Sequence, residues 1–346
     1  MLSTGHRSNC FDIIRHFAAL CVLFSHHYAL SKIAGPKVIG SLSFGGFAVM
    51  IFFSISGFLI TKSFHNSESS WSYLEKRLRR LIPGLVGCSI FLVVLSGMLG
   101  SSRFIDFVFS ARGYNAFIET VTMGLLKDTN GLTQKFIVPA INGSLWTLAY
   151  ELKCYLIIPA VLILFRRSTK SLIVLLVLCI WHQAIYQING YNNNQLSVLT
   201  SLLIPFTIGA LMHFYEGMWS GTKPKILIAA ACLLVLLITP KTGMIQSAYY
   251  PALSILTIII GTSFSDKLIS GKFDYSYGIY IYAFPAQQIC INLIDIGFWP
   301  SMLLSVFVTV VLAAVSWHLI EKPFLRRPKK LNANAKTAAI PEGSGV

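Results

Sequence analysis

Apolar residues in this chain come in runs long enough to cross a lipid bilayer, and this feature constrains the fold more than any other. A transmembrane helix needs about 20 consecutive, mostly apolar residues. Along the 346 residues, ten candidate spans can be marked, some of them short, at 11–31, 43–62, 81–100, 145–165, 171–187, 198–215, 225–239, 246–262, 276–294 and 299–319. The sequence therefore predicts an all-α integral membrane protein with about ten transmembrane helices.

The composition agrees with lipid as the solvent. Hydrophobic residues make up 55% of the chain and charged residues only 12%, whereas a soluble domain carries about 25% charged residues. The net charge of +15 lies in short loops beside the apolar runs, so we attribute it to membrane orientation and not to nucleic-acid binding. The seven cysteines are scattered without CxxC or metal-type spacing, which indicates small buried residues and no metal site.

The distribution of lysine and arginine sets the expected topology. If the N-terminus is cytoplasmic, 19 of the 28 Lys and Arg residues fall in inner segments and 7 in outer loops. The positive-inside rule therefore predicts that both termini are cytoplasmic. The first run, 11–31, contains Asp12, Arg15 and three histidines and ends without a small-residue cleavage site, so it is expected to be a helix and not a signal peptide.

Two segments outside the spans also carry expectations. The one long loop, 101–144, is partly apolar and has room for one or two interfacial helices. The tail, 329–346, is basic and polar and then rich in small residues, so it is expected to be disordered.

Ionisable residues inside spans are costly, and each is a candidate for function. Arg15 and His26 are eleven residues apart, about 16 Å along a helix and close to three turns, so they share a face. In the predicted topology, His26 and Glu151 both lie in the outer half of the membrane. A histidine can take a proton from a sugar hydroxyl while a carboxylate orients it. The alternative is that both are packing groups bonded between helices. His27, on the adjacent face, is expected to be structural or interfacial, and Lys153 is expected to pair with a carboxylate or to reach an interface.

A basic cluster on the predicted cytoplasmic side has two interpretations. Lys76, Arg77, Arg79 and Arg80 stand just before the third span. They can serve topology alone, or they can bind phosphate, because the arginine fork suits phosphate geometry. Arg15 lies near the same face of the membrane.

Five segments in order now match a known family. They are Asp12–Ile–Ile–Arg15 running on to His26, Gly45 to Ile60, Arg77–Leu–Arg–Arg80–Leu–Ile–Pro83, Ser144–Leu–Trp–Thr–Leu–Ala–Tyr–Glu151, and Tyr275 to Pro285 with Glu321–Lys–Pro–Phe324. Over residues 8–328 the chain resembles the acyltransferase-3 family of membrane O-acyltransferases. It looks like a stand-alone member without the fused SGNH domain that some relatives carry.

The resemblance implies an enzyme of the bacterial cytoplasmic (inner) membrane that moves an acyl group, expected to be acetyl, from cytoplasmic acetyl-CoA to a glycan hydroxyl. The acceptor would be O-antigen, exopolysaccharide or a lipid-linked oligosaccharide. His26 would be the general base or acyl carrier with Glu151 in support, and Arg15, Arg77 and Arg80 would bind the CoA phosphates. Residues in and beside the fourth segment are assigned to the substrate: Asn142, Trp146 and Tyr150. The chain departs from many relatives at Ala283, where they have histidine, so that histidine is not essential here.

Two other classes of protein compete with this reading. A transporter or glycan exporter also places histidine, glutamate and arginine inside the membrane. Such proteins often show inverted repeats with broken helices, and no repeat is visible here. A membrane sensor or scaffold would need neither charge cluster.

Overall fold

The structure is a computed structural model. It describes residues 9–124, 126, 129–189, 194–238, 245–269, 271–294 and 296–325, with only the backbone at 245–248. The tail expected to be disordered, 329–346, lies outside the described residues, as do both boundaries of the predicted domain, 8 and 328.

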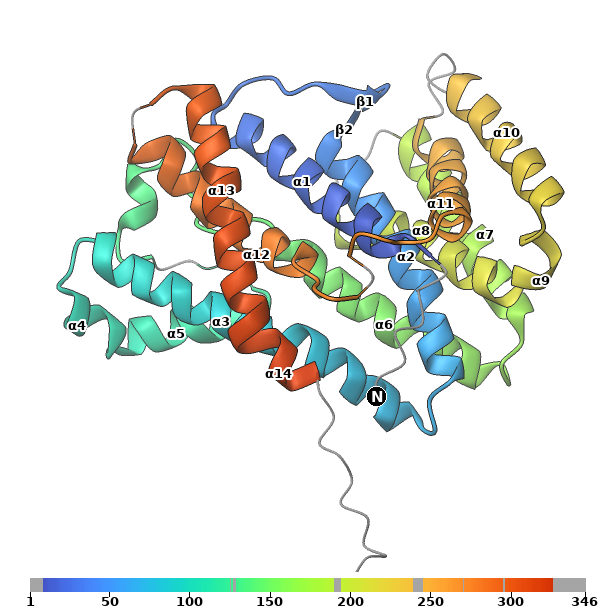
Figure 1. Cartoon of the computed structure of the whole chain (residues 1–346), viewed down its shortest axis with the longest axis horizontal. Coiled ribbons are helices and arrows are strands. Elements are labelled where there is room, and N and C mark those ends of the chain that lie inside the picture. The colour runs from blue at the N-terminus through green and yellow to red at the C-terminus, as the bar shows by residue number, and fades with distance from the viewer. Residues whose placement is uncertain are drawn as a thin grey trace, which may run out of the picture.

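Long helices make up most of the described chain (Figure 1), and each of the ten predicted spans corresponds to one of them. These helices are α1 (Phe11–Leu30), α2 (Phe44–His65), α3 (Ser70–Leu99), α6 (Trp146–Leu164), α7 (Thr169–Ile188), α8 (Gln195–Phe214), α10 (Thr222–Ile238), α11 (Ile245–Ser263), α12 (Ser276–Asn292) and α13 (Phe298–Ser316). The apolar runs thus predicted nine of the ten helices within a few residues, whereas α3 begins at Ser70, eleven residues before its predicted span.

Seven stretches of the described chain are long and apolar enough to cross a membrane. Six are α1, α2, α3, α6, α7 and α8, and the seventh is Phe298–Leu325, which joins α13, the π-helix η3 (Trp317–Glu321) and α14 (Lys322–Leu325). The described side chains of the other three long helices do not add a further stretch of this kind. The structure therefore supports a multi-pass membrane protein, while the count of ten spans and the cytoplasmic termini stay predictions.

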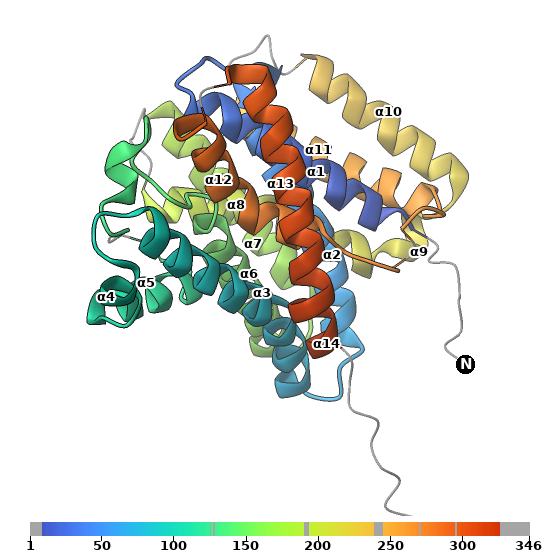
Figure 2. The same cartoon turned by 60° about the vertical axis from the view of Figure 1, so that its left-hand side comes forward.

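Short elements complete the connections. The antiparallel strands β1 (Lys37–Ile39) and β2 (Leu42–Ser43) join α1 to α2. The long loop contains the two short helices that were expected there, α4 (Phe104–Val108) and α5 (Ala111–Val121), followed by the 3-10 turn η1 (Leu132–Lys135). Both helices pack on α3 (Figure 2), and α9 (Glu216–Trp219) lies between α8 and α10.

The segment 136–145 is mostly non-helical and runs against α12. Non-helical backbone inside a membrane domain must find its hydrogen bonds within the protein. The Gln288 side-chain amide donates to the Val138 carbonyl (2.9 Å), and Asn292 Oδ1 accepts from the Ile137 N–H (2.7 Å). These bonds hold the chain that leads into α6 against α12.

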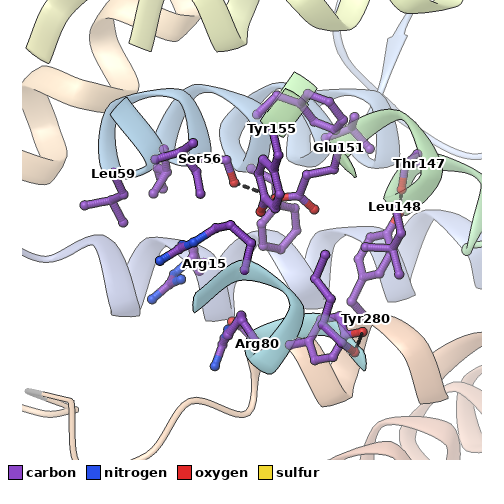
Figure 3. A pocket seen from close by; sticks show the side chains of 18 of the residues that line it. Arg15, Ser56, Leu59, Arg80, Thr147, Leu148, Glu151, Tyr155 and Tyr280 are labelled. Atoms are coloured by element: carbon purple, nitrogen blue, oxygen red, sulfur yellow. Dashed lines mark hydrogen bonds between the residues drawn. The ribbon is translucent and has the colours of Figure 1, made fainter. Parts of the chain in front are cut away.

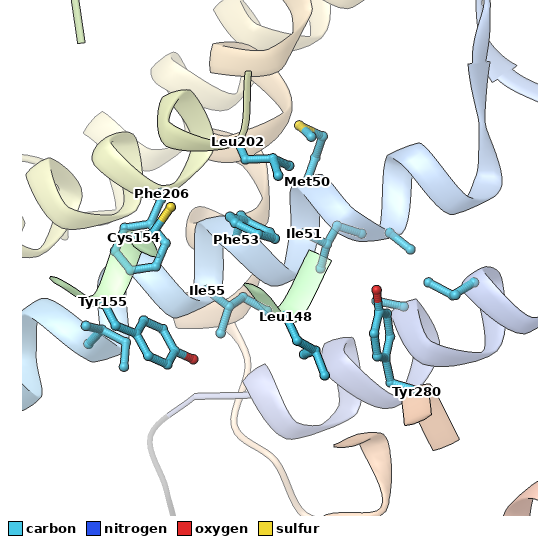
Figure 4. Close-up of a cluster of buried hydrophobic side chains, with 14 of the residues drawn as sticks. Met50, Ile51, Phe53, Ile55, Leu148, Cys154, Tyr155, Leu202, Phe206 and Tyr280 are labelled. Atoms are coloured by element: carbon cyan, nitrogen blue, oxygen red, sulfur yellow. The ribbon is translucent and has the colours of Figure 1, made fainter. Parts of the chain in front are cut away.

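The centre of the core lies where α2, α6 and α8 meet (Figure 4). The ring of Phe206 on α8 is 6.4 Å from that of Phe53 on α2 and 6.0 Å from that of Tyr155 on α6. The seven cysteines are all buried without disulfides, which confirms the reading of them as small buried residues.

Two glycines allow α2 and α8 to approach closely. A Cβ added to Gly57 would lie 2.0 Å from the carbonyl oxygen of Phe206, and one added to Gly209 would lie 2.1 Å from that of Ser54. Both contacts are with backbone, which a side-chain rotation cannot relieve. Small residues are used in this way at helix contacts in membranes.

We predict that Gly57→Ala lowers the thermal stability of the detergent-solubilised protein. Overpacking typically costs about 1–3 kcal/mol, and a backbone contact on both helices offers little relaxation. The matched control is Gly217→Ala, because a Cβ there meets nothing within 4 Å. Equal melting temperatures for the two variants would contradict the close approach of α2 and α8.

Candidate active site

A cavity opens between α1, α2, α3, α6 and α12 and extends to the end of α14. It contains ≈ 950 Å³ of space not filled by protein atoms, part of it open to solvent. Figure 3 shows how side chains from these helices converge on it. Its polar and charged lining consists of Arg15, Ser56, Lys76, Arg77, Arg80, Thr147, Glu151, Tyr155, Ser276, Tyr277 and Tyr280; apolar side chains, chiefly from α2, line the rest.

Helical spacing explains why these residues meet. Residues three or four positions apart lie on one face of a helix. Arg77 and Arg80 therefore point from α3 into the cavity together, and Thr147, Glu151 and Tyr155 do so from α6. The structure thus brings together four of the predicted site residues, since Arg15 of α1 lines the same space.

Glu151 is held by two hydroxyl groups. Its Oε1 accepts hydrogen bonds from Ser56 Oγ (2.7 Å) and from the Tyr155 hydroxyl (2.5 Å). Ser56 lies near the middle of α2, so Glu151 is at mid-depth of the bundle. Among the described residues that line the cavity, Glu151 is the only carboxylate. A carboxylate has about four acceptor sites, so Glu151 retains capacity for a ligand.

Two cations at the cavity have no acidic partner among the described residues. Lys76 Nζ donates to Ser67 Oγ (2.9 Å), and an Arg77 Nη donates to Ser63 Oγ (3.3 Å). Arg77 Nε is buried without a hydrogen bond. The guanidinium of Arg77 therefore keeps most of its five donors for an anion.

The other two arginines share a carboxylate that sequence reasoning missed. Asp274 lies in the loop before α12, and its Oδ2 is 2.6 Å from an Arg80 Nη and 3.3 Å from an Arg15 Nη. Arg15 also bonds Asp12 at 2.5 Å. Burial alone would raise the pKa of Asp274, but the Arg15 and Arg80 guanidiniums hold it well below its usual range. A single aspartate in a short loop carries no sequence signal, so only the fold could show this contact.

His26 does not line the cavity. Its ring packs against Phe284 of α12 with ring centroids 5.3 Å apart, and it forms no hydrogen bond or ion pair within the described part of the chain. No contact joins it to Glu151 there. The sequence placed His26 and Glu151 at comparable depth, whereas Glu151 lies level with the middle of α2, and His26 is close to the far end of α1 from Arg15.

Aromatic side chains run from the cavity lining to the ring that packs on His26. Phe52 and Tyr280 line the cavity with ring centroids 5.7 Å apart, and Phe284 follows Tyr280 by one helical turn. The Tyr280 hydroxyl is fixed by hydrogen bonds to the Thr147 hydroxyl and to the Ser144 carbonyl (3.0 Å). We call Phe52, Tyr280 and Phe284 the aromatic layer.

The three residues assigned to substrate lie outside the cavity wall. Asn142 is buried, and its amide donates to the carbonyl of Ile281 (2.9 Å), so it ties the chain before α6 to α12. Trp146 is 43% exposed on the outward face of α6, beside Tyr150. Lys153 Nζ lies 4.4 Å from the Tyr150 ring centroid, consistent with a lysine that reaches towards one end of its helix.

His27 is expected to be structural, and the structure agrees. It is fully buried, and its Nε2 lies 3.1 Å from both the Phe298 carbonyl and Ser301 Oγ on α13. We predict that His27→Ala destabilises the protein by about 1–3 kcal/mol, because it leaves buried partners unsatisfied. His26→Ala should change thermal stability much less, since His26 loses no hydrogen bond within the described chain. The reverse order of melting temperatures would contradict these assignments.

Comparison with known proteins shows which family this chain belongs to. A family model described as an acyltransferase domain, that of the acyltransferase-3 family, matches residues 8–319. An O-acetyl transferase of Shigella phage Sf6 is 40% identical over 93% of this chain and 97% of its own. Nodulation protein 10 of Rhizobium leguminosarum bv. viciae is 28% identical over 97% of this chain and 98% of its own. No solved structure matches. The chain therefore belongs to the acyltransferase-3 family of membrane O-acyltransferases, as its motifs predicted.

Proposed function

We propose that this enzyme transfers an acetyl group from cytoplasmic acetyl-CoA to a hydroxyl group of a bacterial surface glycan. The observation that carries the proposal is the cavity, in which four cations from α1 and α3 and the hydroxyl-bonded carboxylate of α6 line one space beside an apolar wall from α2. The phage relative is itself named an O-acetyl transferase, which supports acetyl as the group transferred.

The cation end of the cavity suits the phosphates of CoA. Arg77 and Lys76, which have no acidic partner among the described residues, would make the first contacts with them. Arg15 on α1 and Arg80 on α3 line the same cavity and pair with Asp274. The apolar wall formed by α2, with Val49, Ile55 and Leu59, would cover the pantetheine arm. In the predicted topology these cations face the cytoplasm, where acetyl-CoA is found.

The reaction joins an acceptor oxygen to the acetyl carbonyl carbon and breaks the carbon–sulfur bond of the thioester. The acceptor hydroxyl loses a proton, and the departing CoA thiolate gains one. His26 is our candidate for the group that takes the hydroxyl proton, or that carries the acetyl group between donor and acceptor. Glu151, fixed by Ser56 and Tyr155, would support the reaction from the donor side.

The aromatic layer adds a requirement to this scheme. The thioester would be held in the cavity with Glu151, whereas His26 packs on Phe284 beyond the cavity wall. Transfer therefore requires Phe52 or Tyr280 to move, so that the acetyl group can reach the acceptor. The requirement is the same whether the acetyl group is transferred directly or through a covalent acyl-His26 intermediate.

The acceptor class follows from family resemblance. Members of this family typically decorate O-antigen, exopolysaccharide or lipid-linked glycans, and we propose such a glycan at the outer face of the bacterial inner membrane. Loss of acetyl mass from the surface glycan of a deletion strain, measured by mass spectrometry, is the expected result. An unchanged glycan would contradict this acceptor class.

We predict that Arg77→Ala weakens CoA binding by about 10- to 100-fold, because a hydrogen bond to a charged group contributes about 1.5–3 kcal/mol. Arg77→Lys should lose much of the same affinity, since lysine lacks the bidentate fork. Binding would be measured by calorimetry on the purified protein. Arg79→Ala is the matched control on the same helix, because Arg79 pairs with Glu75 on an exposed face and does not line the cavity. Normal CoA binding by a correctly inserted Arg77→Ala protein would leave the cluster with a topological role only.

We predict that His26→Ala lowers acetyl transfer by about 10²–10⁴-fold, the usual contribution of a general base, while CoA binding stays near wild type. Glu151→Gln should also reduce turnover, because a neutral amide keeps only part of the hydrogen bonding of the carboxylate. Transfer would be followed with labelled acetyl-CoA in membranes that contain the acceptor glycan. Full activity of a folded His26→Ala enzyme would remove the histidine from the mechanism and favour a transport function.

A further inference from the structure

We propose that Asp274 is a positioning residue that orients Arg15 and Arg80 together for the phosphate-bearing end of the donor. This inference rests on the proposed function, because it assigns a role in donor binding. Asp274 lies in none of the five motif segments. It is not among the described residues that line the cavity.

One oxygen of Asp274 joins two helices that are far apart in sequence. Oδ2 lies 2.6 Å from an Nη of Arg80 on α3 and 3.3 Å from an Nη of Arg15 on α1. Both arginines line the cavity, and both side chains are 21% exposed. Asp274 therefore bonds Arg80 directly and also pairs with Arg15. Arg15 is held by Asp12 as well, at 2.5 Å.

The carboxylate is itself held in place. Asp274 Oδ1 accepts from Ser276 Oγ at 2.6 Å. The backbone N–H of the next residue, Tyr275, donates to His16 Nε2 (3.0 Å), and His16 Nδ1 lies 2.7 Å from the Asp12 carbonyl. The loop before α12 is thus fastened to α1, and Asp274 cannot shift without breaking these bonds.

Arg80 is further restrained by two rings. Its Cζ lies 5.9 Å from the ring centroid of Tyr277 and 5.8 Å from that of Trp317. Trp317 belongs to the π-helix η3, a type of turn found frequently at functional sites. Two aromatic rings and a carboxylate restrict the Arg80 side chain. This long side chain therefore loses less conformational entropy when a ligand binds than a free arginine would.

Positioning and simple charge balance predict opposite results when Asp274 is neutralised. Removing a negative charge beside a cation site should strengthen anion binding if charge alone matters. If Asp274 orients the guanidiniums, the two like charges lose the group that holds them together, and anion binding should weaken. The contrast makes Asp274→Asn informative, because the amide nearly preserves the shape of the side chain.

The experiment compares purified wild-type protein with Asp274→Asn, using CoA and inorganic pyrophosphate as separate probes. We expect Asp274→Asn to raise the Kd for CoA at least 10-fold and to raise the donor KM more than it lowers kcat. The control Glu75→Gln removes a carboxylate from an exposed arginine pair on the same helix as Arg80, and it should bind both probes as the wild type does. In an Arg80→Gln background, Asp274→Asn should have a smaller effect, because the partner through which it acts is gone.

Each outcome of this experiment either supports the positioning role of Asp274 or overturns it. A folded Asp274→Asn protein that binds CoA as tightly as the wild type, or more tightly, would overturn the proposal. If this variant does not fold, Asp274→Glu decides: a carboxylate displaced by one methylene should weaken CoA binding, and wild-type affinity would overturn the proposal. If wild-type protein binds pyrophosphate but not CoA, and Asp274→Asn weakens pyrophosphate binding, the donor is wrong and the positioning role stands. Binding of neither probe by the wild type overturns both.

Discussion

Most polar groups that this chain buries among its helices need a partner inside the protein, because lipid supplies none. Glu151 accepts hydrogen bonds from hydroxyl groups on α2 and α6. The non-helical segment before α6 forms hydrogen bonds with side-chain amides of α12. Arg15 and Arg80 share Asp274. Each of these partnerships joins elements distant in sequence, so the polar groups of the candidate site also hold the helices in register around it.

The two sides of α2 show how packing and cavity are built from one helix. Gly57 and Ser54 face α8, where the backbones come close enough to exclude a Cβ. Phe52 and Ser56 lie on another face and line the cavity. Because the tight side fixes α2 against α8, the other side can leave space without loosening the bundle. The cavity therefore depends on the small residues behind it as much as on the residues that line it.

The sequence predicted what depends on local pattern. Apolar runs predicted each long helix, and helical spacing together with family motifs selected Arg15, Arg77, Arg80 and Glu151, which the structure brings to one cavity. It did not predict contacts that depend on how helices are placed in space. Asp274 gave no signal, and the separation of His26 from Glu151 follows from the relative heights of α1, α2 and α6, which hydropathy does not set. The hydrogen bond from the Asn142 amide to α12 also depends on how the helices are placed, so the sequence did not predict it.

The order of groups along α1 gives the proposed chemistry a direction. Arg15 lines the cavity near one end of the helix, and Phe52 packs against the cluster that contains Ala19. His26, about 16 Å beyond Arg15, packs on Phe284 past the cavity wall. An enzyme that uses a donor from one side of a membrane and an acceptor from the other must not leave an open path between them. In the proposed scheme, Phe52, Tyr280 and Phe284 would meet this need, because a small acetyl group requires far less space to pass than CoA does. In the proposed scheme the bulky donor would stay where the arginines bind it, and only the transferred group would have to cross the layer.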